Sequence, residues 1–160
     1  MRSFMSTWVY FFYSVLLSLW IGGMAIFTFV ITPVIFKSFG RDTAGEIVGK
    51  LFPVYFPYNL VISLLTLIFL FLLRSAATRS GYKVSVILIG IAVIINVFLI
   101  FKLHPDVRKV KAEIHSVETT SPDSPIMKKF RRLHGVSMIL NFLLLSDGIT
   151  LLYLSASLKE

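Results

Sequence analysis

Two of the three histidines occupy matching positions beside predicted apolar helices. His104 follows Leu103 at the end of one apolar stretch, and His134 follows Leu133 at the start of another. Imidazole nitrogens ligate divalent metals and haem iron, and imidazole exchanges protons near neutral pH. If these helices are neighbours, the pair could bind haem or a metal. We prefer the plainer interpretation that both side chains anchor helix ends, and the spacing of His115 matches no metal motif.

A single acidic residue, Asp147, interrupts the apolar stretch between Arg132 and Lys159. At about 1.5 Å per residue, it lies roughly 20 Å from the start of a helix that begins near residue 133. Ionisable groups at such depth in a membrane are costly and often belong to proton or ion pathways. The alternative, which we prefer, is a structural acid that hydrogen-bonds to Ser146, Ser18 or Thr66.

The only three asparagines, Asn59, Asn96 and Asn141, all lie within apolar stretches. Helical rise places each of them about 10 Å from the side of the bundle that carries the two histidines. A buried amide is unfavourable without hydrogen bonds, so we expect all three to turn inward, with Ser137 on the face of Asn141. We predict a polar layer whose interhelical hydrogen bonds hold the bundle together. The alternative is a polar pocket open toward the histidines.

The elements that position these residues are four stretches almost free of charge. They cover about residues 6–31, 53–73, 84–103 and 133–154. Crossing the hydrocarbon takes about 20 apolar residues, and helices satisfy their own backbone hydrogen bonds there. The sequence therefore predicts an all-α integral membrane protein, with residues 1–160 forming one antiparallel four-helix bundle. The segments at about 42–51 and 105–118 have one apolar face, which predicts short amphipathic helices at the membrane surface.

A stripe of small residues follows the first predicted helix. Ser14, Ser18 and Gly22 recur every four residues, and Gly23 widens the stripe. Small residues let membrane helices approach closely, so we expect this stripe to pack against another helix.

The charge of the chain indicates its partners. The net charge is +8, and the basic residues stand beside the apolar stretches, so anionic lipid headgroups are a better match than nucleic acid. One cluster leads into the last helix: Lys128, Lys129, Arg131 and Arg132. Eleven of the 16 Lys and Arg residues share the side of residues 102–133, which predicts that this side is cytoplasmic. In a prokaryote, the membrane would be the inner (plasma) membrane.

Motifs for chemistry are sparse. The chain has no cysteine, which excludes disulfides, thiolate metal sites, iron–sulfur clusters and covalently attached haem. It has no nucleophile elbow, phosphate-binding loop, zinc-protease motif or dinucleotide fingerprint. Our first hypothesis is a non-enzymatic unit for binding or transport, or an accessory subunit of a larger membrane complex. The second is a redox protein that binds haem or metal through the two histidines.

Four motifs carry a resemblance to a known family: Trp20-Ile21-Gly22-Gly23, Leu51-Phe52-Pro53, Leu103-His104-Pro105 and Leu133-His134-Gly135. Together they resemble the four-span membrane proteins that include transmembrane protein 205, which carry a domain of unknown function. The resemblance covers nearly the whole chain. It implies a four-helix membrane fold and supplies no reaction. A looser similarity is to the copper-resistance D and membrane-bound protoporphyrinogen oxidase types, but this chain has no histidine within its first two helices.

Overall fold

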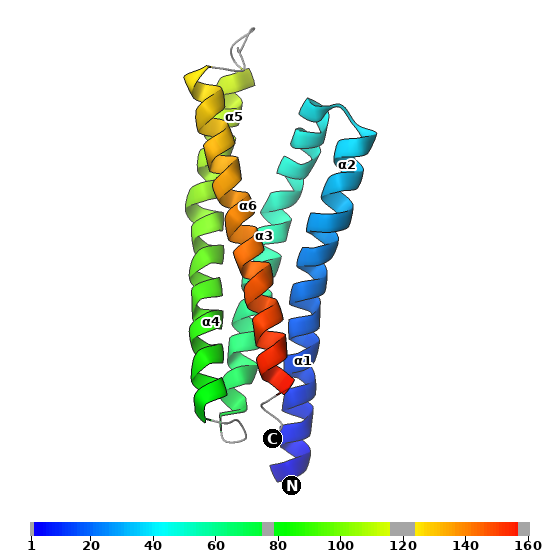
Figure 1. Cartoon of the computed structure of the whole chain (residues 1–160), viewed down its shortest axis with the longest axis vertical. Coiled ribbons are helices and arrows are strands. Elements are labelled where there is room, and N and C mark those ends of the chain that lie inside the picture. The colour runs from blue at the N-terminus through cyan, green and yellow to red at the C-terminus, as the bar shows by residue number, and fades with distance from the viewer. Residues whose placement is uncertain (1, 75–78, 116–123, 157–160) are drawn as a thin grey trace.

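The computed structural model describes residues 2–74, 79–115 and 124–156. Its elements, in chain order, are α1 (Arg2–Ile26), the π-helical segment η1 (Phe27–Ile31), α2 (Thr32–Ser38), α3 (Arg41–Leu72), α4 (Arg79–Phe98), the π-helical segment η2 (Leu99–Leu103), α5 (His104–His115) and α6 (Pro125–Ala156). Several of these elements run end to end, so the chain forms four long antiparallel rods (Figure 1). Within the described residues, four helices are long and apolar enough to cross a membrane: Thr7–Ser38, Asp42–Leu72, Gly81–Ile114 and Pro125–Ala156. The predicted all-α bundle of four membrane-spanning helices is confirmed.

The rods are longer than the sequence predicts, because the two expected surface helices are continuous with them. Residues 42–51 form the first part of α3, which continues through Pro53 and Pro57. The segment expected at 105–118 is α5, which follows η2 without a break. Residues 116–118 lie outside the described residues.

Both π-helical segments end two residues before a proline, Pro33 in one case and Pro105 in the other. Proline has no N–H, and its ring clashes with the carbonyl four residues earlier, which ordinarily breaks or kinks a helix. A wider turn accommodates the ring: the Thr32 and His104 N–H groups donate to carbonyls five residues back. The first and third spans, which we expected to end near residues 31 and 103, therefore continue through Pro33 and Pro105.

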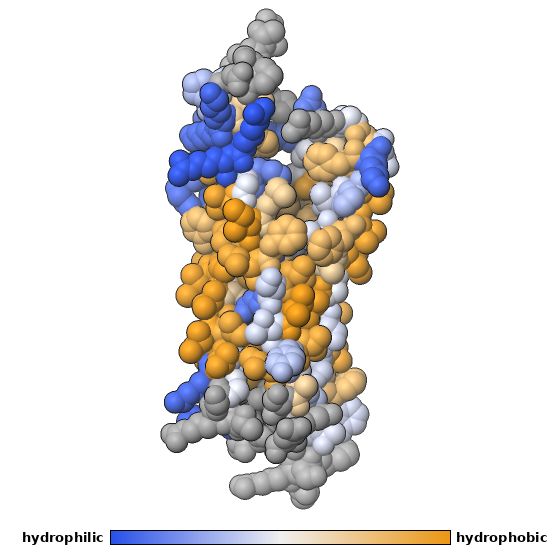
Figure 2. All heavy atoms as spheres, viewed as in Figure 1, coloured by the Kyte–Doolittle hydropathy of each residue, from blue (hydrophilic) through white to orange (hydrophobic). Residues whose placement is uncertain are grey.

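The surface divides into an apolar middle and a hydrophilic end. Figure 2 shows an apolar band around the bundle, with hydrophilic residues gathered at the end that carries α5. On α4, large side chains such as Ile87, Ile91 and Ile94 recur every three or four residues and are highly exposed. An apolar stripe of this size on the outside of a bundle is expected where lipid covers it.

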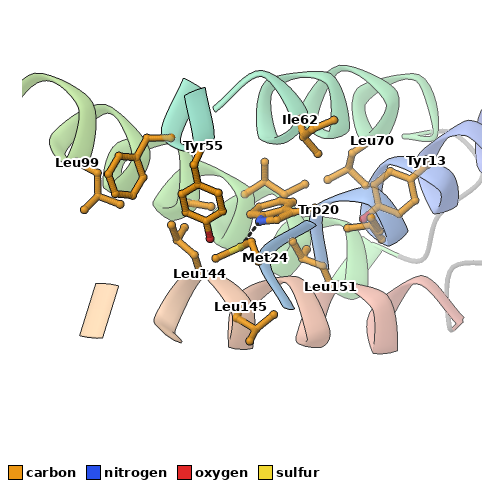
Figure 3. Packing of buried hydrophobic residues seen from close by; sticks show 14 of the residues in the cluster. Tyr13, Trp20, Met24, Tyr55, Ile62, Leu70, Leu99, Leu144, Leu145 and Leu151 are labelled. Carbon is orange, nitrogen blue, oxygen red and sulfur yellow. Dashed lines mark hydrogen bonds between the residues drawn. The ribbon is translucent and has the colours of Figure 1, made fainter. Parts of the chain in front are cut away.

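The core is formed by buried side chains of α1, α3, α4, η2 and α6. On α1, four buried side chains recur at intervals of four, three and four residues: Tyr13, Leu17, Trp20 and Met24. Trp20 donates a hydrogen bond from its indole Nε1 to the Met24 Sδ at 3.1 Å, and this pair lies between Ile62, Leu144 and Leu151 (Figure 3). Side chains of α3 and α6 thus pack around Trp20.

The predicted small-residue stripe lies about 100° around α1 from this buried face, one residue further along the helix. Ser18 is exposed and donates to the Ser14 carbonyl of its own helix. A Cβ on Gly22 would meet no atom within 4 Å, whereas a Cβ on Gly23 would come within 2.9 Å of Tyr58. Close helix contact is therefore seen at Gly23 and not at Gly22.

The contact between α1 and α6 gives a prediction about Gly148. A Cβ there would come within 3.0 Å of Ile21 Cγ1, so a larger side chain must push the two helices apart. We expect Gly148→Leu to lower the free energy of unfolding by about 1–3 kcal/mol. Unfolding in mixed micelles, followed by circular dichroism, measures this change.

Gly22→Leu is the matched control, because it makes the same chemical change where a Cβ would meet open space. We expect it to change the unfolding free energy by no more than about 0.5 kcal/mol. Equal losses in the two variants would contradict close packing at Gly148.

Candidate functional site

The structure brings His104, His134 and Ser137 into one pocket. His104 is the first residue of α5, and the other two lie one turn apart on α6. The remaining lining is apolar and comes from α3, η2 and α5: Phe52, Phe56, Leu99, Leu103 and Val107. The cavity holds about 10 Å³, which is the space that one water molecule needs. The two histidines therefore face one small, mostly apolar pocket.

Aromatic rings fix both imidazoles. Phe52 and Phe56 stack on each other with centroids 5.1 Å apart, and His104 meets both rings edge-on at 5.9 and 6.0 Å. His134 stacks on Phe130 at 6.1 Å, one turn earlier on α6. These contacts orient the imidazoles and leave both half-buried. Phe52 and Phe56 were not predicted to belong to the site of the two histidines, although both follow the short charged segment that leads to the second span.

The haem or metal interpretation finds no support in this geometry. Two histidines share the pocket, but residues 2–74, 79–115 and 124–156 contain no group of three or more metal-binding side chains that could hold an ion. The remaining lining is aromatic or aliphatic apart from Ser137.

One of the three amides joins helices. Asn141 on α6 accepts a hydrogen bond from Tyr55 Oη at 2.7 Å and donates to Thr28 Oγ1 at 2.9 Å. Thr28 lies in η1, and Phe27 beside it stacks on Tyr55 with centroids 4.0 Å apart. This network ties η1, α3 and α6 together, as the predicted polar layer requires. Tyr55 was not predicted to belong to this layer; its spacing of four residues from Asn59 is the signal for an inward face.

The other two amides, Asn59 and Asn96, bond to their own helices instead. Both side chains are fully buried. Asn59 Nδ2 donates to the Tyr55 carbonyl at 3.1 Å, and Asn96 Nδ2 donates to the Ala92 carbonyl at 2.9 Å. Across the described part of the chain, neither Oδ1 atom has a hydrogen-bond partner. The interhelical bonding that we predicted for three amides is therefore seen for Asn141 alone.

Asp147 lacks the partners that the sequence analysis expected. Both carboxyl oxygens are buried, and neither has a hydrogen-bond partner among the described residues. Ser18 and Thr66 donate to carbonyls of their own helices, and Thr150 donates to the Ser146 carbonyl. The structure thus shows a buried acid without the expected hydrogen bonds.

Basic residues surround the pocket end of the bundle. Lys128, Lys129, Arg131 and Arg132 are all exposed on the first turns of α6. On α5, Arg108 is exposed and lies one helical turn after His104, so its positive charge acts on the imidazole. The acid Asp106 pairs with Lys102 at 3.2 Å. The helices that contribute His104 and His134 to the pocket thus also carry a surplus of exposed positive charge.

Comparison with known proteins places the chain in a family. A protein of Aquifex aeolicus (strain VF5), described as an uncharacterized protein, is 30% identical over 130 residues, which cover 81% of this chain and 83% of that protein. No solved structure matches the chain. Residues 15–116, which include about half of α1 and all of α3, α4 and α5, match the family described as Domain of unknown function (DUF4149). The chain therefore belongs to the DUF4149 family.

Proposed function

We propose that this membrane protein is a non-enzymatic binding unit that takes the headgroup of an anionic lipid at the pocket of His104, His134 and Ser137. The observation that carries the proposal is the convergence of these three polar side chains from α5 and α6 in one pocket, on helices that also carry exposed basic residues. Imidazole and hydroxyl groups donate hydrogen bonds to phosphate oxygens, and the nearby Arg108 supplies positive charge.

The position of the pocket supports a lipid over a water-soluble anion. His104 lies where the apolar segment η2 is followed by the basic helix α5, the level at which headgroups are expected. The pocket wall of Phe52, Phe56 and Leu99 continues toward the apolar part of the bundle. Since the cavity of about 10 Å³ holds no more than one water molecule, a headgroup must displace side chains as it enters.

Lipid retention tests this proposal. The protein is incorporated in nanodiscs of phosphatidylcholine with a minority of phosphatidylglycerol, and bound lipid is counted by native mass spectrometry after release. We expect His104→Ala combined with His134→Ala to weaken phosphatidylglycerol binding about tenfold, the equivalent of about 1.4 kcal/mol. Arg108→Ala is expected to weaken it as well.

Lys83→Ala is the control, because Lys83 is an exposed cation on α4, whose N-terminal end lies opposite the pocket end of the bundle (Figure 1). We expect it to leave retention unchanged. Unaltered phosphatidylglycerol binding in the double histidine variant would refute a headgroup site at this pocket.

Asp147 supports a second candidate function, proton-coupled transport. An acid in the middle of a membrane helix, with both oxygens buried, is typical of proton and ion pathways.

A third candidate role is that of an accessory subunit in a larger membrane complex. The apolar sides of the rods support it, because they could pack against other membrane helices.

We also propose that the chain is related to the proteins that include transmembrane protein 205. Residues of the motifs that carry this resemblance lie at a helix contact and in the pocket: Gly23 lies against Tyr58, and His104 and His134 line one pocket.

Finally, we propose a cytoplasmic location for the pocket end of the bundle, on the basis of its surplus of basic residues.

A further inference from the structure

The contact between α3 and α4 suggests where Asn59 and Asn96 lie relative to each other. Phe52 and Phe56 of α3 line one pocket with Leu99 and Leu103 of η2, and the two rods are antiparallel, so we infer an alignment of 52 with 103 and of 56 with 99. Three residues further along α3 and three residues back along α4, this alignment reaches Asn59 and Asn96. Both side chains are fully buried, as expected if they meet at the interface of the two helices.

The seam between these helices is polar over several turns. Asn59, Ser63 and Thr66 recur on α3 at intervals of four and three residues, and all three are fully buried. On α4, Asn96 and the equally buried Ala92 and Ile89 follow the matching intervals in the opposite direction. The seam thus places polar groups in the interior, whereas the outer face of α4 is apolar.

Nearly every side-chain donor in the seam is already used within its own helix. Ser63 Oγ donates to the Leu60 carbonyl, and Thr66 Oγ1 donates to the Ile62 carbonyl. The Asn59 and Asn96 amide N–H groups are used in the same way. What these side chains offer to one another is therefore oxygen, which accepts hydrogen bonds and does not donate them.

Two buried acceptors brought together by this alignment cannot satisfy each other. Asn59 Oδ1 and Asn96 Oδ1 have no partner in the described chain, and a buried acceptor without a hydrogen bond is unfavourable. The hydroxyls of Tyr13 and Ser85, which are neighbours, also lack a partner. A hydroxyl can rotate to donate or accept, so this second pair can satisfy itself, while the amide oxygens need a donor from elsewhere.

We propose that a small hydrogen-bond donor or cation, such as a water molecule or a monovalent ion, is bound between Asn59 Oδ1 and Asn96 Oδ1. A water molecule has two O–H donors, which matches two acceptor oxygens, and a cation is coordinated by the same atoms. An anion is excluded because it would face acceptors only. This site lies deeper than the histidine pocket, beyond Phe56 and Leu99, and does not rest on the proposed headgroup binding.

Solid-state NMR of the intact protein in lipid bilayers tests the site directly. The chain has three asparagines and no glutamine, so labelling asparagine with ¹³C at Cγ gives three carboxamide signals. Asn141→Leu removes the signal of Asn141 and so identifies the other two signals as those of Asn59 and Asn96.

Two measurements identify the bound species. In spectra edited by magnetisation transfer from water protons, we expect the Asn59 and Asn96 signals to appear if water is bound. Replacing sodium chloride with choline chloride is expected to shift the same two signals if a sodium ion is bound. Either result supports the site and names its occupant. Absence of both effects in the folded native protein would overturn the proposal, because the two amides would then have neither water nor ion between them.

Discussion

Replacing Trp20 with alanine is expected to lower the free energy of unfolding by about 3–5 kcal/mol, more than any other truncation in the core. The Trp20 side chain is fully buried, and it is the largest such side chain among the described residues. Figure 3 shows it between α3 and α6, bonded to Met24. Truncation removes these contacts and leaves a cavity that helices on several sides must close. Unfolding in mixed micelles, monitored by circular dichroism, measures the change.

Trp8 provides the control, since it lies on the same helix but is 51% exposed. We expect Trp8→Ala to cost about 0.5 kcal/mol or less. Trp20→Phe keeps most of the ring volume and removes only the indole N–H, so it should fall between the two alanine variants. Similar losses in Trp8→Ala and Trp20→Ala would show that Trp20 is not the centre of the core.

The four spans could be predicted because the membrane imposes a simple rule on sequence. A backbone in hydrocarbon must bond to itself, so long charge-free stretches become helices whatever their neighbours are. Helix ends are governed by different physics. Pro33 and Pro105 are helix-ending signals by local sequence, but a π turn accommodates each ring and lets the helix continue. Whether a proline ends or widens a helix depends on packing, which local sequence does not contain.

The pocket was only half predictable for a related reason. The sequence places His104 and His134 at the same end of the bundle, since one apolar stretch ends where the next begins. Their contact with one pocket depends on α5 packing against α6. Because the four helices have similar hydrophobicity, the sequence does not indicate which of them are neighbours. For the same reason, the hydrogen bond between Tyr55 and Asn141, which are 86 positions apart, could not be predicted.

The buried acid gives the second large prediction. Replacing Asp147 with leucine is expected to raise the free energy of unfolding by about 2 kcal/mol, because an acidic side chain at the centre of a membrane helix costs about 2.5–3.5 kcal/mol. Both Asp147 oxygens lie buried and without partners in the parts of the chain that the structure describes, so no hydrogen bond is lost in return. The gain is measured by the same unfolding experiment as for Trp20. Asp106→Leu is the control: this acid pairs with an exposed lysine, and its removal should change stability by about 0.5 kcal/mol or less.

A gain in stability alone does not distinguish a proton-carrying acid from an unused one, so flux must be measured on the same variants. The protein is reconstituted in vesicles that contain a pH-sensitive dye, and a potassium gradient with valinomycin sets the membrane potential. If Asp147 carries protons, Asp147→Asn, which keeps the shape of the side chain, should reduce proton flux to that of empty vesicles, and Asp106→Asn should not. Unchanged flux in Asp147→Asn would remove the transport candidate.

A loss of stability in Asp147→Leu would instead mean that the carboxyl group is hydrogen-bonded in the membrane, by a lipid, a water molecule or another protein. In that case the acid is structural, and the pocket of His104 and His134 is left as the better-supported site of function.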